Sequence, residues 1–289
     1  MGPGFKYHIV SISAIFFALT VGLVIGSVFV SPQVADRQGR AIGRLQQTLN
    51  SDVEETRRDN ARYKECVGAI SPLALRGRLK GGAVAIIQTG DYPDAATSAS
   101  EGVAMGDPQG IVHLGLTGSL DRSDDEVRRA LVDLHAANPR IPADRDSLLQ
   151  VIAQALARGD SPADPILRAL DREGLVHVTQ DDNFALPVKM VVIVAGSRSP
   201  ESQRAGRVDA PLARALLRQG ISVVICEPQS ATSSDIPSVL GLKDDLSTID
   251  NVDTDIGQCA LVLAFGTPHG MYGVKPTAVR LMPLPAGTP

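Results

Sequence analysis

The feature that most constrains this chain is a run of 22 uncharged, mostly apolar residues at positions 9–30, IVSISAIFFALTVGLVIGSVFV. As an α-helix with a rise of about 1.5 Å per residue, this run spans roughly 33 Å, enough to cross the hydrocarbon core of a bilayer. A buried core helix is usually shorter, and so is the apolar part of a cleaved signal peptide. We therefore predict a retained membrane-spanning helix at 9–30, preceded by a short tail at 1–8.

Three small residues, Ala18, Gly22 and Gly26, recur every four positions inside this run. They share one helix face, where small side chains would let a second membrane helix approach closely. Small residues are also common in membrane helices in general, so the spacing alone leaves both interpretations open. These three residues form the candidate face for helix association.

The charges beside the run do not fix its orientation. Lys6 precedes it, whereas Arg37, Arg40 and Arg44 follow it. Taken literally, the positive-inside rule would keep the C-terminal part in the cytoplasm, but long domains are translocated despite such charges. Charge therefore leaves the topology open.

Residues 31–72 are strongly polar and helix-favouring, between Pro32 and Pro72. Apolar residues recur here with the seven-residue spacing of a coiled coil, although the middle of the seam is polar. We predict a short, coiled-coil-like stalk, with a helix docked on the globular domain as the alternative. The seam carries Cys66, which two copies in a parallel dimer would bring together. Its remaining apolar members are Ile42, Leu45, Leu49, Tyr63 and Ile70.

The rest of the chain, residues 73–289, alternates between strand and helix patterns. Apolar runs predict strands at 83–88, 110–116, 175–178, 189–194 and 221–226. Helices are expected at 123–137, from 144 or 146 to 159, at 162–173, at 209–219 and, as a buried helix, at 258–265. This order predicts an α/β domain with a mainly parallel, Rossmann-like sheet, because such strands are joined by right-handed crossovers. The proline-rich tail after Pro268 is expected to be irregular.

Composition excludes several classes of function. Net charge is −4, and there is no basic stripe with interleaved aromatic residues, so we expect no nucleic-acid partner. Three cysteines are too few for a disulfide scaffold. The polar loops at 198–207 and 230–234 follow successive strands, which makes them candidates for ligand binding by position alone.

No catalytic motif is present. Glycine-rich phosphate loops, the G-x-S-x-G elbow and the H-E-x-x-H zinc motif are all absent, so we expect neither an enzyme nor an organic cofactor. The one arrangement suited to a copper ion is His269 and Met271, ten residues or more after Cys259. A loop histidine and a methionine packed against the core are the simpler interpretation.

Both ends of the chain resemble the MctB family of actinobacterial copper transport proteins. At the N-terminus the likeness rests on 5–8 (FKYH) and on the pattern of small and apolar residues in the anchor. At the C-terminus it rests on 251–254 (NVDT), 257–263 (GQCALVL), 272–275 (YGVK) and 281–283 (LMP). The family plan also matches: one N-terminal anchor, a helical segment and an α/β domain.

The resemblance implies a single-pass membrane protein whose α/β domain lies outside the cytoplasm and which takes part in copper efflux or homeostasis. One helix cannot enclose a pore, so such a role needs a homo-oligomer or an adjacent channel. Other members resemble partners of a second membrane protein that controls cell-wall hydrolysis at the septum. A dimeric, non-enzymatic scaffold for a cell-wall hydrolase is therefore the alternative.

Overall fold

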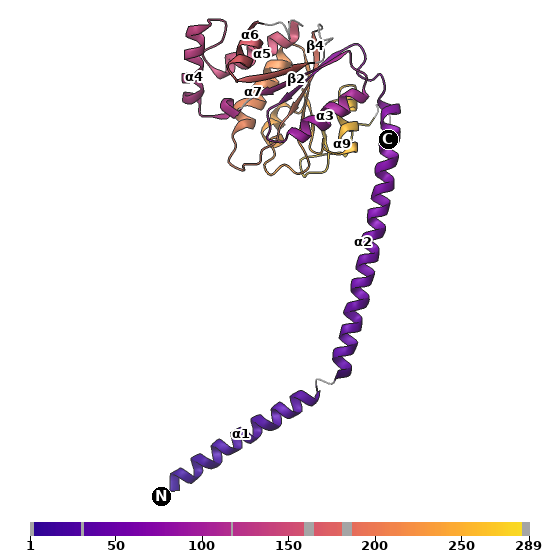
Figure 1. Ribbon diagram of the computed structural model, residues 1–289, viewed down its shortest axis with the longest axis vertical. Coiled ribbons are helices and arrows are strands. Elements are labelled where there is room, and N and C mark those ends of the chain that lie inside the picture. Colours follow the sequence, from indigo (N-terminus) through magenta and orange to yellow (C-terminus); the bar gives the residue numbers. More distant parts are fainter. Residues whose placement is uncertain (1–2, 30–31, 117, 159–164, 181–186, 285–289) are drawn as a thin grey trace. The chain divides into compact units, whose positions relative to one another are not determined.

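The computed structural model describes residues 3–29, 32–116, 118–158, 165–180 and 187–284. The chain divides into two compact units, Met1–Tyr63 and Lys64–Pro289 (Figure 1). The first unit contains helix α1 and most of helix α2. The second contains the last turns of α2 and a layered α/β domain.

Helix α1, Pro3–Phe29, contains residues 9–29 of the apolar run and begins within the predicted tail, and residue 30 lies outside the described residues. Its stretch Tyr7–Gly26 is long and apolar enough to cross a membrane, and every side chain in that stretch is exposed within the chain. Exposed apolar surface of this extent matches a lipid environment, because a helix that is apolar all round is buried in protein or spans a bilayer. The predicted membrane helix is therefore present, by length and composition.

Helix α2, Pro32–Leu75, is the long polar helix expected after the anchor. Pro32 occupies its first position, where the missing N–H costs no hydrogen bond. The helix continues three residues past Pro72, where the prediction ended it. Pro72 lacks the N–H that would bond the carbonyl four residues earlier, so it weakens the helix locally without ending it.

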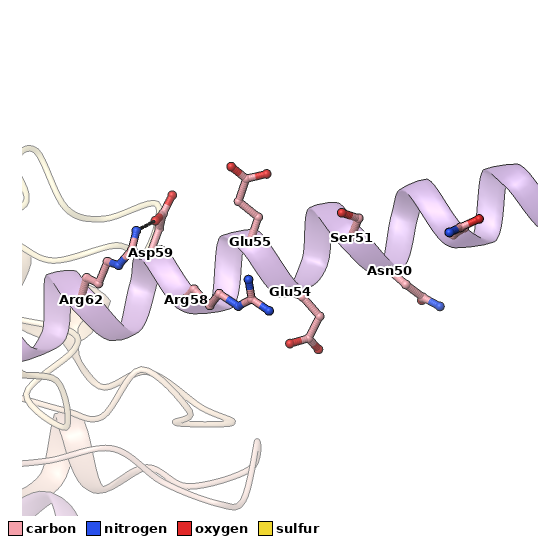
Figure 2. A pocket seen from close by; sticks show the side chains of 8 residues that line it. Asn50, Ser51, Glu54, Glu55, Arg58, Asp59 and Arg62 are labelled. Carbon is pink, nitrogen blue, oxygen red and sulfur yellow. Dashed lines mark hydrogen bonds and ion pairs between the residues drawn. The ribbon is translucent and has the colours of Figure 1, made fainter.

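The apolar seam of α2 is exposed along its length, including Ile42, Leu49, Tyr63 and Ile70. Figure 2 shows the polar side chains that line a pocket on the same helix, all of them from α2. Exposed ion pairs such as Arg62–Asp59, at 3.1 Å, contribute little stability there. The helix is thus amphipathic, with its apolar stripe unpaired within the described chain.

The last turns of α2 belong to the α/β domain. Val67, Ser71 and Leu75, spaced four apart, form the face that packs into the domain core. The hydroxyl of Ser71 donates to the Val67 carbonyl at 2.6 Å and lies 2.9 Å from the Cys259 thiol. The seam residues Cys66 and Ile70 remain exposed, so docking and the seam use different faces of one helix.

The domain is built on one seven-stranded sheet with the order β3-β2-β1-β4-β5-β6-β7. Neighbouring strands are parallel except for the β2–β3 pair, which is antiparallel. The strands are β1 (Ala83–Gln88), β2 (Gly110–Leu116), β3 (Val176–Gln180), β4 (Val188–Val194), β5 (Ser222–Cys226), β6 (Ser247–Ile249) and β7 (Met271–Tyr272).

Alternating side chains of the central strands fill two separate cores. In β1, Ala83, Ala85 and Ile87 face one core, whereas Val84 and Ile86 face the other. The first core is covered by α4 (Asp124–Ala137), α5 (Arg145–Arg158), α6 (Pro165–Arg172) and α7 (Ala210–Arg218). The second is covered by α3 (Pro93–Met105), α9 (Asp255–Ala264) and the end of α2, so the sheet lies between two helical layers (Figure 1).

The predicted strands and helices of the domain are confirmed, with small shifts at their ends. Residues 159 and 162–164, predicted as helix, lie outside the described residues. The elements that were not predicted include α3, β6, β7 and the four-residue helix α8 (Ile236–Val239). The tail is not wholly irregular, because β7 pairs with β6 through hydrogen bonds such as Asp250 N–H to the Tyr272 carbonyl at 3.2 Å.

The order of the strands creates a switch point between β1 and β4. After β1 the chain passes through α3 to β2, whereas after β4 it passes through α7 to β5. Because α3 and α7 cover opposite faces, the loops leaving β1 and β4 diverge at the carboxyl edge of the sheet. In open α/β sheets, ligands bind in the crevice at such a point.

Candidate functional site

A network of charged and polar side chains occupies this switch point. Asp91, in the loop after β1, accepts hydrogen bonds from the Ser197 hydroxyl at 2.8 Å and the Arg198 backbone N–H at 3.1 Å. The Arg204 guanidinium donates to its other oxygen at 2.9 Å. Burial acts to raise the pKa of Asp91, but these hydrogen bonds and the Arg204 charge outweigh it and hold the pKa below its usual value. Asp91 is therefore a fixed anion that ties the loop after β4 to the loop after β1.

Asp121 extends this network to the short 3₁₀ helix η1 (Gly118–Asp121). Its carboxylate lies 3.8 Å from Arg204 Nε and accepts a hydrogen bond from the Ser202 hydroxyl at 3.3 Å. Arg207 donates to the Asp121 backbone carbonyl at 3.1 Å. A cavity of about 340 Å³ opens here, with a wholly polar lining of Asp121, Ser197, Ser199, Glu201, Ser202, Gln203 and Arg207.

Two buried carboxyl groups lie behind this pocket. Asp235 is 2% exposed and accepts the Gly196 N–H at 2.7 Å, and burial raises its pKa. Asp209 is fully buried, and burial, together with the charges of Asp235 and Asp121, raises its pKa to about 8. A carboxyl with that pKa is mostly protonated at neutral pH.

A buried ion pair lies farther along the carboxyl edge of the sheet, beside β5 and β6. Glu227, directly after β5, is 0% exposed and accepts from Lys275 Nζ at 2.6 Å and from the Asp235 N–H at 2.9 Å. Asp250, after β6, accepts the backbone N–H groups of Val274 and Lys275 at 2.7 and 2.9 Å. The segment after β7 is thereby bound to the carboxyl ends of β5 and β6.

The switch-point network can bind and orient polar groups, since its pocket offers both donors and acceptors. Among the residues that the structure describes, no three His, Cys, Asp or Glu side chains are arranged to hold a metal ion. The loop at 198–207 of this network was predicted as a candidate for ligand binding from its position after a strand. The sequence did not predict its acidic neighbours, because their proximity depends on which strands are adjacent in the sheet. These neighbours are Asp91, Asp121, Asp209 and Asp235.

The three candidate copper ligands do not lie together. His269 and Met271 line one pocket of about 390 Å³, with Lys243, Asp244, Pro268, Gly270, Tyr272, Val279, Arg280 and Leu284. Cys259 lies elsewhere, buried on α9 with its thiol against Ser71. The pocket thus contains one imidazole and one thioether from the predicted set, without the thiol.

The candidate association residues lie on the exposed parts of the chain. A methyl group added at Gly22 or Gly26 would meet no atom within 4 Å, so both positions have open space for a close neighbour. Ala18 lies one turn before them on the same face of α1. The seam residues of α2, with Leu45 and Leu49 at its start, also face open space.

Comparison with known proteins identifies the family. A family described as "Copper transport outer membrane protein, MctB" matches residues 4–283, which is nearly the whole chain. Proteins described as "Copper transporter MctB" from Mycobacterium tuberculosis and Mycobacterium bovis are each 22% identical to this chain over 315 residues. The aligned region covers 93% of this chain and 98% of each relative.

The match extends from the apolar helix through α2 to the end of the α/β domain. The match therefore covers the segments that form the anchor, the long helix and the parallel sheet of this chain. The chain therefore belongs to the MctB family of copper transport proteins and is anchored in a membrane by its N-terminal helix.

Proposed function

We propose that this chain is an envelope protein of copper homeostasis that acts as an oligomer or beside a channel, with its α/β domain outside the cytoplasm. The observation that carries the proposal is the family match over residues 4–283. Within the described residues, one helix is long and apolar enough to span a membrane. Since one helix cannot enclose a pore, copper passage needs further helices from other copies or from a partner.

The pocket of His269 and Met271 is the proposed point of contact with copper. Imidazole and thioether groups suit Cu(I), and the partner copy or the transported ion's own ligands would supply the remaining positions. The α/β domain acts here as a binding and regulatory part without catalysis. This part of the proposal is supported by the absence of catalytic motifs in the sequence.

Copper binding by the full-length protein in mild detergent tests the proposal. Titration of Cu(I) against a chromogenic chelator should give stoichiometric binding that falls at least tenfold in affinity when His269→Ala and Met271→Leu are combined. His177→Ala removes an exposed histidine on β3 and serves as the matched control. Unchanged binding in the double variant would show that this pocket does not bind copper. If the protein binds no Cu(I) and a deletion strain is as copper-resistant as the wild type, the copper role itself is contradicted.

A second candidate function is a dimeric scaffold that controls a cell-wall hydrolase together with a second membrane protein. The exposed apolar seam of α2 favours it, because a parallel coiled coil would bury this seam. Parallel pairing would also follow from the anchors of two copies entering the same membrane from one side.

Disulfide formation through Cys66 tests the dimer. Cys66 is exposed, whereas Cys226 and Cys259 are buried, so mild oxidation in membranes should give a crosslinked dimer through Cys66 alone. Cys66→Ser should abolish that species, and Cys259→Ser should retain it. A strictly monomeric protein in mild detergent, with no crosslink in membranes, would contradict the scaffold.

A further inference from the structure

The buried carboxyl of Asp209 has no role in the proposed copper site or in the dimer. Asp209 ends a π-helical turn, Ala205–Asp209, which leads into α7. Single π turns of this kind occur often at functional sites. The side chain lies behind the switch-point pocket and is 0% exposed.

Unsatisfied polar atoms gather around Asp209. Six buried side-chain atoms lack a hydrogen-bond partner among the described residues, and four of them belong to Asp209, Asp121 and Arg204. Both carboxyl oxygens of Asp209 are in this set. Native proteins leave few such atoms, so this concentration requires an explanation.

The charges that face Asp209 come from several elements and are mostly negative. Asp121 approaches from η1, and Asp235 from the start of α8 (Ile236–Val239). Arg204 is the facing cation, but its guanidinium is already bonded to Asp91 at 2.9 Å and lies 3.8 Å from Asp121. An ionised Asp209 would therefore be a buried anion that shares one cation with Asp91 and Asp121, which disfavours the ionised form.

The Thr89 hydroxyl lies near Asp209 without a hydrogen bond to it. A hydrogen bond donated by Thr89 would favour the carboxylate and lower the pKa of Asp209. The hydroxyl proton, however, is directed to the Val194 carbonyl at 3.3 Å, which leaves its oxygen free to accept. A protonated Asp209 can donate to that oxygen or to a neighbouring carboxylate, and so supply a partner that the cluster otherwise lacks.

We propose that Asp209 is a proton-binding site that holds the wall of the switch-point pocket in place. The loop at 196–204 forms the wall of this pocket and is tied down by Asp235 through Gly196 and by Asp91 through Ser197. When Asp209 loses its proton, a third anion beside Asp121 and Asp235 competes for Arg204, and this loosens the loop. The loop is held in place at neutral and acidic pH and loosens as the medium becomes alkaline.

Infrared spectroscopy of the full-length protein in detergent tests the bound proton directly. The C=O stretch of a protonated carboxylic acid should be present at pH 6, disappear with a midpoint near pH 8, and be missing from pH 6 upwards in Asp209→Asn. Asp133→Asn changes an exposed aspartate on α4 and should leave the band unchanged. Absence of the band at pH 6, or its persistence in Asp209→Asn, would overturn the proposal.

A second variant keeps the test independent of how well Asp209→Asn folds. Asp235→Asn removes a neighbouring negative charge, while its amide oxygen can still accept the Gly196 N–H. The midpoint of the infrared band should therefore move to lower pH. An unchanged midpoint would show that the neighbouring charges do not keep Asp209 protonated, and this would contradict the proposal.

Amide hydrogen exchange tests the link to the loop. After correction for the intrinsic pH dependence of exchange, protection of residues 196–204 should fall above pH 8 in the wild type. In Asp209→Asn it should stay constant across the same range, because no charge appears. If wild type and variant show the same pH profile, the loop does not respond to Asp209. Neither readout depends on copper, so the result is separate from that of the copper proposal.

Discussion

The ion pair between Lys275 and Glu227 gives the sharpest prediction about stability. Lys275→Met keeps the methylene stem but removes the ammonium group, which lies 2.6 Å from Glu227 and also donates to the Pro228 carbonyl at 3.0 Å. Glu227, which is 0% exposed, would then keep only the Asp235 N–H as a partner.

Removing one member of a buried ion pair typically costs about 3–5 kcal/mol, because the remaining charge stays buried. The side chain of Lys275 is 17% exposed, so solvent screens this pair only weakly. For a unit of this size, 1 kcal/mol corresponds to roughly 2–4 °C in Tm. We therefore expect Lys275→Met to lower the Tm of the domain by about 10 °C.

The neighbouring cysteine provides the assay. Cys226 immediately precedes Glu227, is 0% exposed, and has its thiol pKa raised by burial and by the Glu227 charge, so it is unreactive in the folded domain. Labelling with a thiol-specific probe along a temperature ramp, followed by mass spectrometry, reports the unfolding of β5. Cys66 is exposed and serves as the internal reference for probe reactivity.

A double variant separates the buried charge from lost packing. Adding Glu227→Gln to Lys275→Met removes the unpaired charge while keeping the shape, and should recover more than half of the lost Tm. If the single variant loses less than about 1 kcal/mol, or the double variant is no more stable than the single one, the reasoning is refuted.

Two further predictions concern backbone contact and pH. Gly257→Ala should destabilise the domain by about 1–3 kcal/mol, because the added methyl group would overlap the Asn251 carbonyl; Gly206→Ala, where nothing lies within 4 Å, is the control in a thermal melt. Hydrogen bonds from the hydroxyl and backbone N–H of Ser123 hold the pKa of Glu126 below its usual value. This contribution to α4 is present above about pH 4.5 and lost on acidification. After correction for the intrinsic pH dependence of exchange, protection of the amides in the first turn should therefore fall at acidic pH in the wild type and not in Glu126→Gln.

Much of the domain could be predicted because its strands carry strong local signals. The runs at β1, β4 and β5 are continuous and apolar, since both faces of a central parallel strand are buried. Helix α3 lacks such a signal: its sequence, PDAATSASEGVAM, is made largely of small residues that pack closely against α9. The short strands β6 and β7 exist only because a longer sheet is already there to pair with.

The site could be predicted only in part, for a related reason. The loop at 198–207 could be predicted because it follows a strand. The ion-pair partners of Arg204, however, are Asp91 and Asp121, which lie 113 and 83 residues earlier in the chain. No local pattern indicates that these residues meet, because the meeting follows from the crossover between β1 and β4. The separation of Cys259 from His269 has the same origin, since α9 turns its thiol towards the end of α2.

The short strand β7 has a consequence for how copies of this protein can associate. A free sheet edge is a template for joining two sheets into one, and proteins avoid this by shortening or covering the edge strand. Here β7 has two residues, and its outer side is taken by the returning chain, with the Val279 N–H donating to the Met271 carbonyl at 2.9 Å and the Gly273 N–H to the Arg280 carbonyl at 2.9 Å. This edge is therefore closed to strand addition, so pairing of strands between copies could not use β7.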